Sequence, residues 1–227
     1  MDSKFDITPG NIYDYNAGMP YGRRAQSSIY FAVGKRFCDI VMALVATVVF
    51  SPFIIIVALC IWLEDRHSPI FRQERIGLGG KAFTLYKFRS MIVDAEANDD
   101  GDLEPHLCEK NDSRLTRIGR FLREHHLDEF PQLWNVLRGD MSFVGPRPER
   151  RFFIRQIMEV APEYNRLYVL RPGLFSHATL HNGYTDTIEK MIIRLRMDLE
   201  YLDKISFATD IRIIYDTAMS ILRGKKF

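Results

Sequence analysis

The sequence has few cysteines and almost no net charge. Its 227 residues include three cysteines, Cys38, Cys60 and Cys108, and no CxxC pair. The three cannot all be bridged, so a reducing compartment and no structural zinc site are expected. The 31 Lys and Arg residues balance 29 Asp and Glu residues, which leaves a formal net charge of +2. Because a nucleic-acid-binding protein that acts through overall charge is strongly basic, no nucleic acid is expected among the partners.

The N-terminal residues lack the short basic segment of a signal peptide. They contain Asp2, Asp6 and Asp14 and keep no helical or strand period, so residues 1–30 are predicted to form a loose arm. By contrast, the twenty-four residues from Ile40 to Leu63 carry no charge. As a helix they would extend ~36 Å, which is enough to cross a hydrocarbon core of ~30 Å. This segment is therefore predicted to be a retained membrane element.

A Ser-Pro pair, Ser51-Pro52, lies at the midpoint of the apolar segment. Proline removes one backbone hydrogen bond and clashes with the preceding turn, so the helix must kink or break there. Lys35 and Arg36 precede the segment and Arg66 follows it, so the flanking charges give little asymmetry. Two paths stay open on these grounds: a re-entrant segment whose ends share one face of the membrane, and a spanning helix with a tolerated kink.

The rest of the chain predicts an α+β fold that is mostly helical. Turn residues at Gly77–Gly80, between segments of strand-like composition, predict a small β-hairpin within residues 69–93. Apolar residues recur with helical spacing in three later segments, 113–126, 188–202 and 211–222. The second of these is expected to begin behind a cap at Thr185 or Asp186.

The segment from His125 to Pro131 contains adjacent carboxylates, Asp128 and Glu129. Proline is permitted in a first helical turn and an apolar face follows, so Asp128 is predicted to lie at or near a helix N-terminus. The helix dipole favours an ionised carboxylate there. From the residues alone, a structural cap and a catalytic carboxylate both stay open. A zinc site of His125 and Glu129 would lack further ligands.

Cationic residues near these carboxylates could bind an anionic substrate. Arg147 lies between two prolines, which hold it on a rigid support and so reduce the entropy lost on binding a phosphate. In the predicted hairpin, alternation places polar residues on shared strand faces: Gln73, Arg75, Lys87 and Arg89. From the residues alone, solvated or structural roles are equally open.

The order of these motifs resembles that of the bacterial sugar transferases, the monotopic phosphoglycosyl transferases. Lys35–Asp39 and the broken apolar run resemble the start of that family. The later motifs follow in the same order: Phe71–Gly77 (FRQERIG), Tyr86–Met91 (YKFRSM), Leu127–Leu137 (LDEFPQLWNVL), Gly139–Pro148 (GDMSFVGPRP) and Arg171–Gly173 (RPG). The resemblance covers about residues 33–224.

The resemblance implies transfer of a sugar 1-phosphate from a nucleoside diphosphate sugar, usually a UDP-sugar, to polyprenyl phosphate. It places Asp128 as the nucleophile that forms a covalent phosphosugar intermediate, with Glu129 as its catalytic partner. It also implies Mg²⁺, held at Asp128. Ser51-Pro52 then becomes the break of a re-entrant helix. Such enzymes work at the cytoplasmic face of the bacterial inner membrane and begin the assembly of capsule, O-antigen or exopolysaccharide.

The implied organisation is an arm (1–30), a re-entrant helix-break-helix (31–66) and a cytoplasmic catalytic domain (67–227). This would be the minimal form of the family. The lipid bilayer is expected as a partner, and a second copy of the chain, as a homodimer, stays open. The substrate-binding residues are expected to be Lys87, Arg89, Arg123, Arg147, Gln73 and Arg75.

The chain departs from the family after Arg171–Gly173. Many members continue with Ile-Thr-Gly-Trp-Ala-Gln-Val-Asn-Gly, whereas Leu174–Gly183 read LFSHATLHNG, so no sugar can be named. The alternatives are a membrane-anchored scaffold without catalysis and a lipid-phosphate hydrolase.

Overall fold

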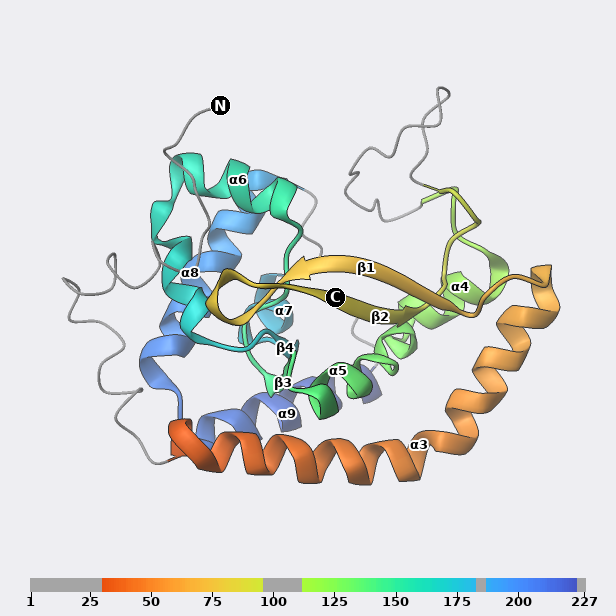
Figure 1. Ribbon diagram of the computed structural model, residues 1–227, viewed down its shortest axis with the longest axis horizontal. Coiled ribbons are helices and arrows are strands. Elements are labelled where there is room, and N and C mark those ends of the chain that lie inside the picture. Colours follow the sequence, from red (N-terminus) through yellow and green to blue (C-terminus); the bar gives the residue numbers. More distant parts are fainter. Residues whose placement is uncertain (1–29, 96–111, 183–186, 224–227) are drawn as a thin grey trace.

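The computed structural model describes residues 30–95, 112–182 and 187–223 (Figure 1). Apart from Tyr30, the predicted loose arm lies outside these residues. The described elements are α3 (Lys35–Asp65), β1 (Ile70–Ile76), β2 (Ala82–Phe88), α4 (Arg117–Glu124), α5 (Gln132–Arg138), β3 (Ser142–Val144), α6 (Arg151–Val160), β4 (Gly173–Phe175), α7 (His177–Asn182), α8 (Ile188–Lys204) and α9 (Phe207–Leu222). The prediction of a mostly helical α+β protein is confirmed.

The main core lies where α6, α8 and the residues of the β3 segment meet. Its largest fully buried side chains include Met141, Val144, Ile154, Ile157 and Leu202. The helical spacing read in 188–202 and 211–222 reappears as α8 and α9. The cap of α8 is Thr187, whose side chain accepts a hydrogen bond from the Lys190 backbone N–H. The cap expected at Thr185 or Asp186 was therefore placed too early.

The predicted hairpin is confirmed as the antiparallel pair β1–β2, in which Phe71 lies opposite Lys87 and Arg75 opposite Phe83. A second, parallel pair joins β3 to β4. Its backbones pass so closely that a Cβ on Gly145 would lie 2.4 Å from the Arg171 carbonyl oxygen, and one on Gly173 would lie 2.1 Å from the Gly145 nitrogen. Both positions therefore require glycine.

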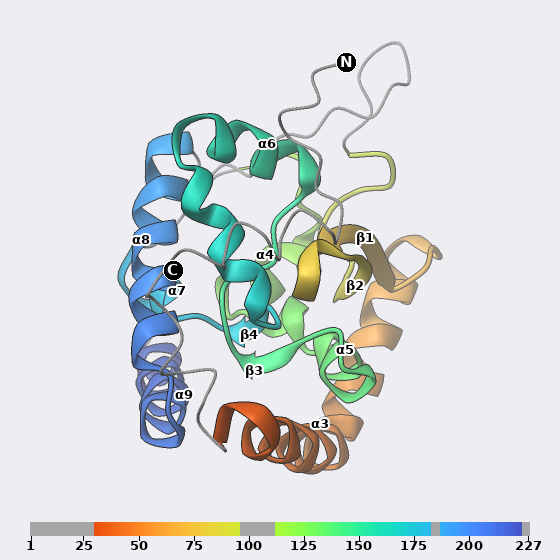
Figure 2. The ribbon, with the colours of Figure 1, turned by 60° about the vertical axis from the view of Figure 1, so that its left-hand side comes forward.

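Helix α3 forms one edge of the molecule and bends about halfway along its length, where Pro52 lies in the sequence (Figures 1 and 2). It is a single helix from Lys35 to Asp65. The Ser-Pro pair thus lies at a bend within a continuous helix, which is the kink that the proline predicts, and the helix is not interrupted there. The reason is local: the Val48 carbonyl, which proline leaves without a backbone donor, accepts a hydrogen bond from the Ser51 hydroxyl at 2.9 Å.

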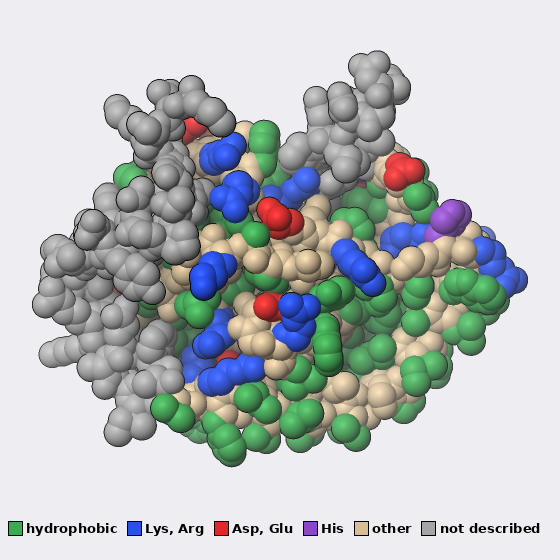
Figure 3. Space-filling view, viewed as in Figure 1, with side chains coloured by type: hydrophobic (Ala, Val, Ile, Leu, Met, Phe, Trp, Pro, Cys, Tyr) green, Lys and Arg blue, Asp and Glu red, His purple; other side chains and the backbone are tan. Residues whose placement is uncertain are grey.

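Much of α3 remains uncovered. It is long and apolar enough to cross a membrane, yet only 11% of its most apolar window is buried inside the protein. Its exposed large side chains are Phe37, Val41, Leu44, Val45, Val48, Val49, Phe50, Ile55, Ile56, Leu59, Trp62 and Leu63. Figure 3 shows hydrophobic side chains along this edge, with Lys and Arg side chains gathered on the neighbouring surface. This exposure separates α3 from the core helix of a soluble protein.

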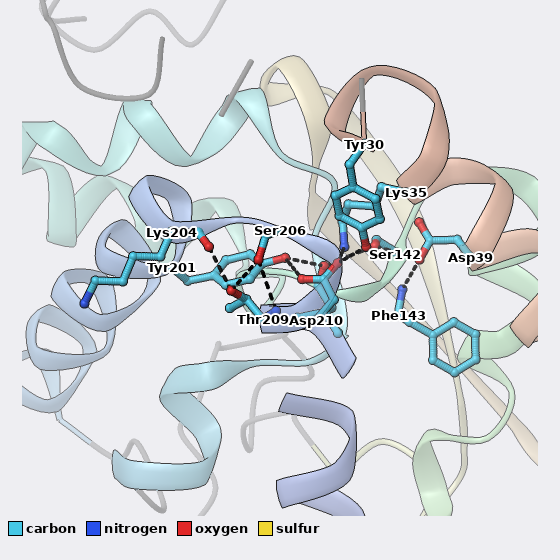
Figure 4. Close-up of polar contacts among 11 residues, drawn as sticks. Tyr30, Lys35, Asp39, Ser142, Phe143, Tyr201, Lys204, Ser206, Thr209 and Asp210 are labelled. Atoms are coloured by element: carbon cyan, nitrogen blue, oxygen red, sulfur yellow. Dashed lines mark hydrogen bonds and ion pairs between the residues drawn. The ribbon is translucent and has the colours of Figure 1, made fainter. Parts of the chain in front are cut away.

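A buried polar network fixes the N-terminal end of α3 to the rest of the molecule (Figure 4). Lys35 pairs with Asp210 of α9, which also accepts hydrogen bonds from the hydroxyls of Tyr30 and Tyr201 at 2.7 and 2.6 Å. One turn later, Asp39 accepts the Phe143 backbone N–H at 2.9 Å. Because these groups are buried, losing either carboxylate would leave donors unsatisfied, at a cost of roughly 1–3 kcal/mol each.

The C-terminal end of α3 is fixed to the same body. Asp65 pairs with Arg89 at the end of β2, and Glu64 accepts the backbone N–H of Arg117 at 3.0 Å, at the first turn of α4. Between the two ends, the ring of Phe130 packs against Phe50 and Phe53 at centroid distances of 4.9 and 5.5 Å. The bend of α3 thus lies directly against the residue that follows Glu129.

Candidate active site

The two adjacent carboxylates lie in a tight turn between α4 and α5. His126 adopts the left-handed conformation, with φ of 56°, and a single 3-10 turn follows over Leu127–Glu129. Helix α5 begins only at Gln132. Asp128 therefore lies within this 3-10 turn, four residues before the start of α5, and is near the helix N-terminus without being its cap. A left-handed histidine is strained, which is a common feature of residues beside functional sites.

Glu129 is the centre of an ion-pair cluster. Its carboxylate lies 2.8 Å from Lys87 of β2 and 3.2 Å from Arg147, which follows β3. Burial raises the pKa of Glu129, but the charges of Lys87 and Arg147 outweigh burial and hold this pKa well below its ordinary value. In turn, the charge of Glu129 raises the pKa of Arg147. Glu129 and Arg147 are therefore both ionised at neutral pH.

Asp128 has a different environment. It is 5% exposed, and among the described residues its carboxylate makes no hydrogen bond or ion pair. Burial raises its pKa above the ordinary value, and the neighbouring Glu129 charge adds to this, while Lys87 and Arg123 oppose it. Two adjacent carboxylates are thus driven toward different pKa values, as occurs where they perform different tasks.

Two hollows meet at the Glu129–Arg147 pair. The smaller is polar, with Arg75, Lys87 and Gln132 in its wall. The larger has a volume of about 260 Å³ and is mostly apolar, and it extends from Glu129 and Arg147 to Phe50 of α3. Glu129 lines both hollows and Asp128 lines neither. Access to Asp128 is thus more restricted than access to its neighbour.

The structure brings together some of the predicted site residues. Lys87 and Arg147 contact Glu129, and Arg123 lies close enough to lower the pKa of Asp128. Arg75 lines the polar hollow and donates a hydrogen bond to Gln73 at 2.5 Å.

Two predicted residues lie apart from the cluster. Gln73 lines neither hollow, and its side-chain oxygen accepts a hydrogen bond from Arg75, which lines the polar one. Arg89 pairs with Asp65 at the end of α3 rather than with the carboxylates of the turn. β2 ends at Phe88, so Arg89 lies just beyond the strand, and the sequence could not show that the end of α3 lies beside it.

Two buried residues that the sequence analysis missed support the cluster. Asn135 is fully buried and joins α5 to β2: its side chain accepts the Tyr86 N–H at 3.1 Å and donates to the Thr84 carbonyl at 2.7 Å. Asp198 of α8 accepts hydrogen bonds from the Ser176 hydroxyl at 3.0 Å and from the Arg147 backbone. A polar residue within an apolar helical stripe was the available signal for Asp198.

The residues of the turn fit a magnesium ion held partly by substrate. No group of three or more His, Cys, Asp or Glu side chains that could hold a metal occurs in the part of the chain that the structure describes. Mg²⁺ is commonly bound by one or two carboxylates together with substrate phosphates. Asp128 supplies one carboxylate that no cation of the described chain occupies, whereas Glu129 is already paired twice.

Comparison with known proteins places this chain in a family. The model of the family described as bacterial sugar transferase matches residues 30–224. A UDP-N-acetylgalactosamine-undecaprenyl-phosphate N-acetylgalactosaminephosphotransferase of Aeromonas hydrophila is 36% identical over 203 residues, 89% of this chain and 47% of that protein. The chain thus spans about half the length of that relative.

Two further relatives are similar over more of their own length. A UDP-glucose:undecaprenyl-phosphate glucose-1-phosphate transferase of Caulobacter vibrioides is 40% identical over 190 residues, 83% of this chain and 69% of that protein. The exopolysaccharide production protein PSS of Rhizobium leguminosarum bv. phaseoli is 40% identical over 207 residues, 85% of this chain and 98% of that protein. Because the family model matches most of the length of this chain, the chain belongs to the bacterial sugar transferase family.

Proposed function

We propose that this protein transfers a sugar 1-phosphate from a UDP-sugar to polyprenyl phosphate and releases UMP. The observation that carries the proposal is the Glu129–Lys87–Arg147 cluster beside the bent apolar helix. A pyrophosphate donor needs fixed cations, and a polyprenyl acceptor needs contact with lipid. The names of the relatives, which specify UDP-sugars and undecaprenyl phosphate, support both substrate classes.

The proposed chemistry has two displacements at one phosphorus atom. An oxygen of Asp128 forms a bond to the sugar-bearing phosphorus, while the bond from that phosphorus to the bridging oxygen breaks and UMP leaves with the electron pair. An oxygen of polyprenyl phosphate then attacks the same phosphorus and frees Asp128. Lys87 and Arg147 offset the negative charge of the pyrophosphate, and Glu129 holds both cations in place. A bound Mg²⁺ would neutralise further charge on the phosphates.

We propose that α3 is re-entrant, as expected for work at the cytoplasmic face of the inner membrane. Both ends of the helix are fixed to one polar body, through Lys35 and Asp39 at one end and Asp65 at the other. A charged body of this size cannot cross the hydrocarbon core, so contacts at both ends favour one face. This supports the re-entrant path over a spanning helix.

The decisive measurement is UMP release by the purified protein from a panel of UDP-sugars with Mg²⁺. A covalent mechanism gives one UMP per active site without lipid, and continuous turnover once polyprenyl phosphate is added. Asp128→Asn should abolish both, because the amide cannot attack. Glu129→Gln should slow both severely and still leave a trace of enzyme that carries the sugar phosphate covalently, which a labelled sugar in the donor would reveal. Chelation with EDTA should stop UMP release.

Other outcomes point elsewhere. Turnover that begins only with lipid, with no label on the protein, would replace the covalent path by direct attack. A label on Glu129, which lines both hollows, would move the nucleophile by one residue. No UMP from any donor would favour the scaffold, and release of phosphate from polyprenyl phosphate would favour the hydrolase.

A further inference from the structure

The larger hollow has a composition that the transfer chemistry alone does not require. Its volume is about 260 Å³. Its walls come from elements far apart in the sequence, and they are mainly apolar: Ala46 and Phe50 of α3, Phe130, Leu133 of α5, Leu180 of α7 and Ile221 of α9. The charged pair Glu129 and Arg147 lies in the same wall. The hollow is therefore an apolar chamber with an ionic group in its wall.

Two of the three hydroxyl groups in the chamber wall are poorly suited to bind a sugar, because both already donate to partners within the protein. Thr217 donates its hydroxyl hydrogen to the Ile213 carbonyl at 2.7 Å, and Ser176 donates to Asp198 at 3.0 Å. These donors are satisfied within the protein, while a bound sugar would leave its own hydroxyls against apolar walls. Each such unpaired group costs roughly 1–3 kcal/mol. An apolar ligand faces no such penalty.

The chamber wall also reaches the exposed apolar face of α3. Phe50 lines the chamber and is itself 42% exposed, and the adjacent Val49 is 63% exposed. A chain that moves along α3 out of the bilayer therefore meets the chamber without crossing a polar surface. The bend of α3 sets this geometry, because Phe50 lies against Phe130 beside Glu129.

We propose that this chamber holds the isoprene units next to the phosphate of polyprenyl phosphate, with that phosphate directed toward Arg147. The inference rests on the proposed function and deepens it by assigning the acceptor's place. The volume lies just below the range of roughly 300–1,000 Å³ that is usual for drug-sized ligands. It thus suits only the first units, and the remainder of the tail stays in the bilayer along α3.

The test separates the two half-reactions, which are UMP release without lipid and the transfer of the sugar phosphate to polyprenyl phosphate. Ala46→Phe fills the chamber from α3, and Val48→Phe adds the same ring on the opposite, exposed face of the same helix as a matched control. The single UMP release without lipid should remain at the wild-type level in both variants. The concentration of polyprenyl phosphate that gives half-maximal turnover should rise at least tenfold for Ala46→Phe and less than twofold for Val48→Phe.

A second pair guards against a folding defect in the first. Ile221→Trp fills the chamber from α9, and Ala218→Trp adds the same ring at an exposed position of α9. Both variants should keep the lipid-free release of UMP, and only Ile221→Trp should need a higher concentration of polyprenyl phosphate for half-maximal turnover. Loss of lipid-free UMP release in the filled variants alone would make the chamber a donor site and overturn the inference. Equal kinetics in filled and control variants would overturn it as well. A wild-type protein that releases no UMP would instead refute the proposed function.

Discussion

At the scale of single residues, the site depends on the different environments of two neighbouring carboxylates. Glu129 is paired with two cations, whereas Asp128 is buried without an ion pair among the described residues. Lys87 and Arg147 occupy the Glu129 carboxylate, whereas no cation of the described residues forms an ion pair with Asp128. This contrast favours Asp128 for attack and Glu129 for holding the cations.

Arg147 offers a direct test of the cation cluster. Arg147→Ala should lower kcat/KM for the UDP-sugar about 10- to 100-fold, since a hydrogen bond to a charged group is worth ~1.5–3 kcal/mol. Arg147→Lys should recover little, because an ammonium lacks the planar fork of a guanidinium. Arg138→Ala removes an arginine half exposed beside Asp140 and is the control. Steady-state kinetics near wild-type for Arg147→Ala would make Arg147 structural.

Asp198 predicts a pH dependence of stability. Burial raises its pKa from 3.8 to about 7, although Arg194 and the Ser176 hydroxyl oppose this. Between these values the folded state keeps a proton that the unfolded state has released. The stability from this group is therefore fully present below pH ~4 and is lost as the pH rises toward 7.

Asp198→Asn removes this titration. Relative to the wild type, the free energy of unfolding of the variant should rise between pH 4 and 7 and stay level above that. At ~1.4 kcal/mol per pKa unit, the change is at most ~4 kcal/mol. Urea unfolding of both proteins at several pH values measures it. A difference that does not vary with pH would show that Asp198 is charged throughout this range.

At the scale of elements, the bend of α3 decides what lies beside the site. Proline costs roughly 3 kcal/mol in a helix interior, and here the Ser51 hydroxyl satisfies the carbonyl that Pro52 leaves open. The bend in turn lets Phe50 and Phe53 pack on Phe130. Two residues in the middle of an apolar helix thus position the turn that carries the carboxylates.

Pro52→Ala should straighten α3, because it restores the backbone donor and removes the clash. Spin labels at exposed positions 33 and 67 should then move apart toward the ~50 Å of a straight helix, and turnover should fall as Phe130 loses its contacts. Leu59→Ala changes an exposed residue of α3 away from the Ser-Pro pair and should keep the wild-type label distance. If the distance in Pro52→Ala is also unchanged, the contacts at the helix ends set the bend.

Local patterns made the hairpin and the helices α4, α8 and α9 predictable, because each follows from the periodicity of its own residues. The parallel pair β3–β4 was not predictable in this way. Its strands, Ser142–Val144 and Gly173–Phe175, are too short to show a period, and each depends on a partner distant in sequence. The same limit applies to Arg89, whose partner Asp65 is set by the path of α3.

At the scale of the whole molecule, α3 gives the protein an apolar edge and leaves the charged site just beside it (Figure 3). The proposed donor, a UDP-sugar, is soluble and the proposed acceptor is held in lipid, so a site at this boundary could reach both. The polar networks of Lys35 and Asp39 and the Asp65–Arg89 pair prevent α3 from leaving the body as an independent span. The helix and the catalytic body are therefore expected to enter the membrane as one unit.

This arrangement predicts that both ends of the chain lie in the cytoplasm. Single cysteines at position 3 or 226, in a chain whose three cysteines are replaced by serine, should both resist a membrane-impermeant maleimide in intact cells and both react after permeabilisation. The reason is that a re-entrant helix returns its C-terminal end to the face from which it entered. A spanning α3 instead puts one position outside, so labelling of only one cysteine in intact cells would refute the re-entrant path.

The Asp65–Arg89 ion pair can be tested with the same assay. Asp65→Ala leaves Arg89 buried without its partner, and it should increase the fraction of chains with one end outside.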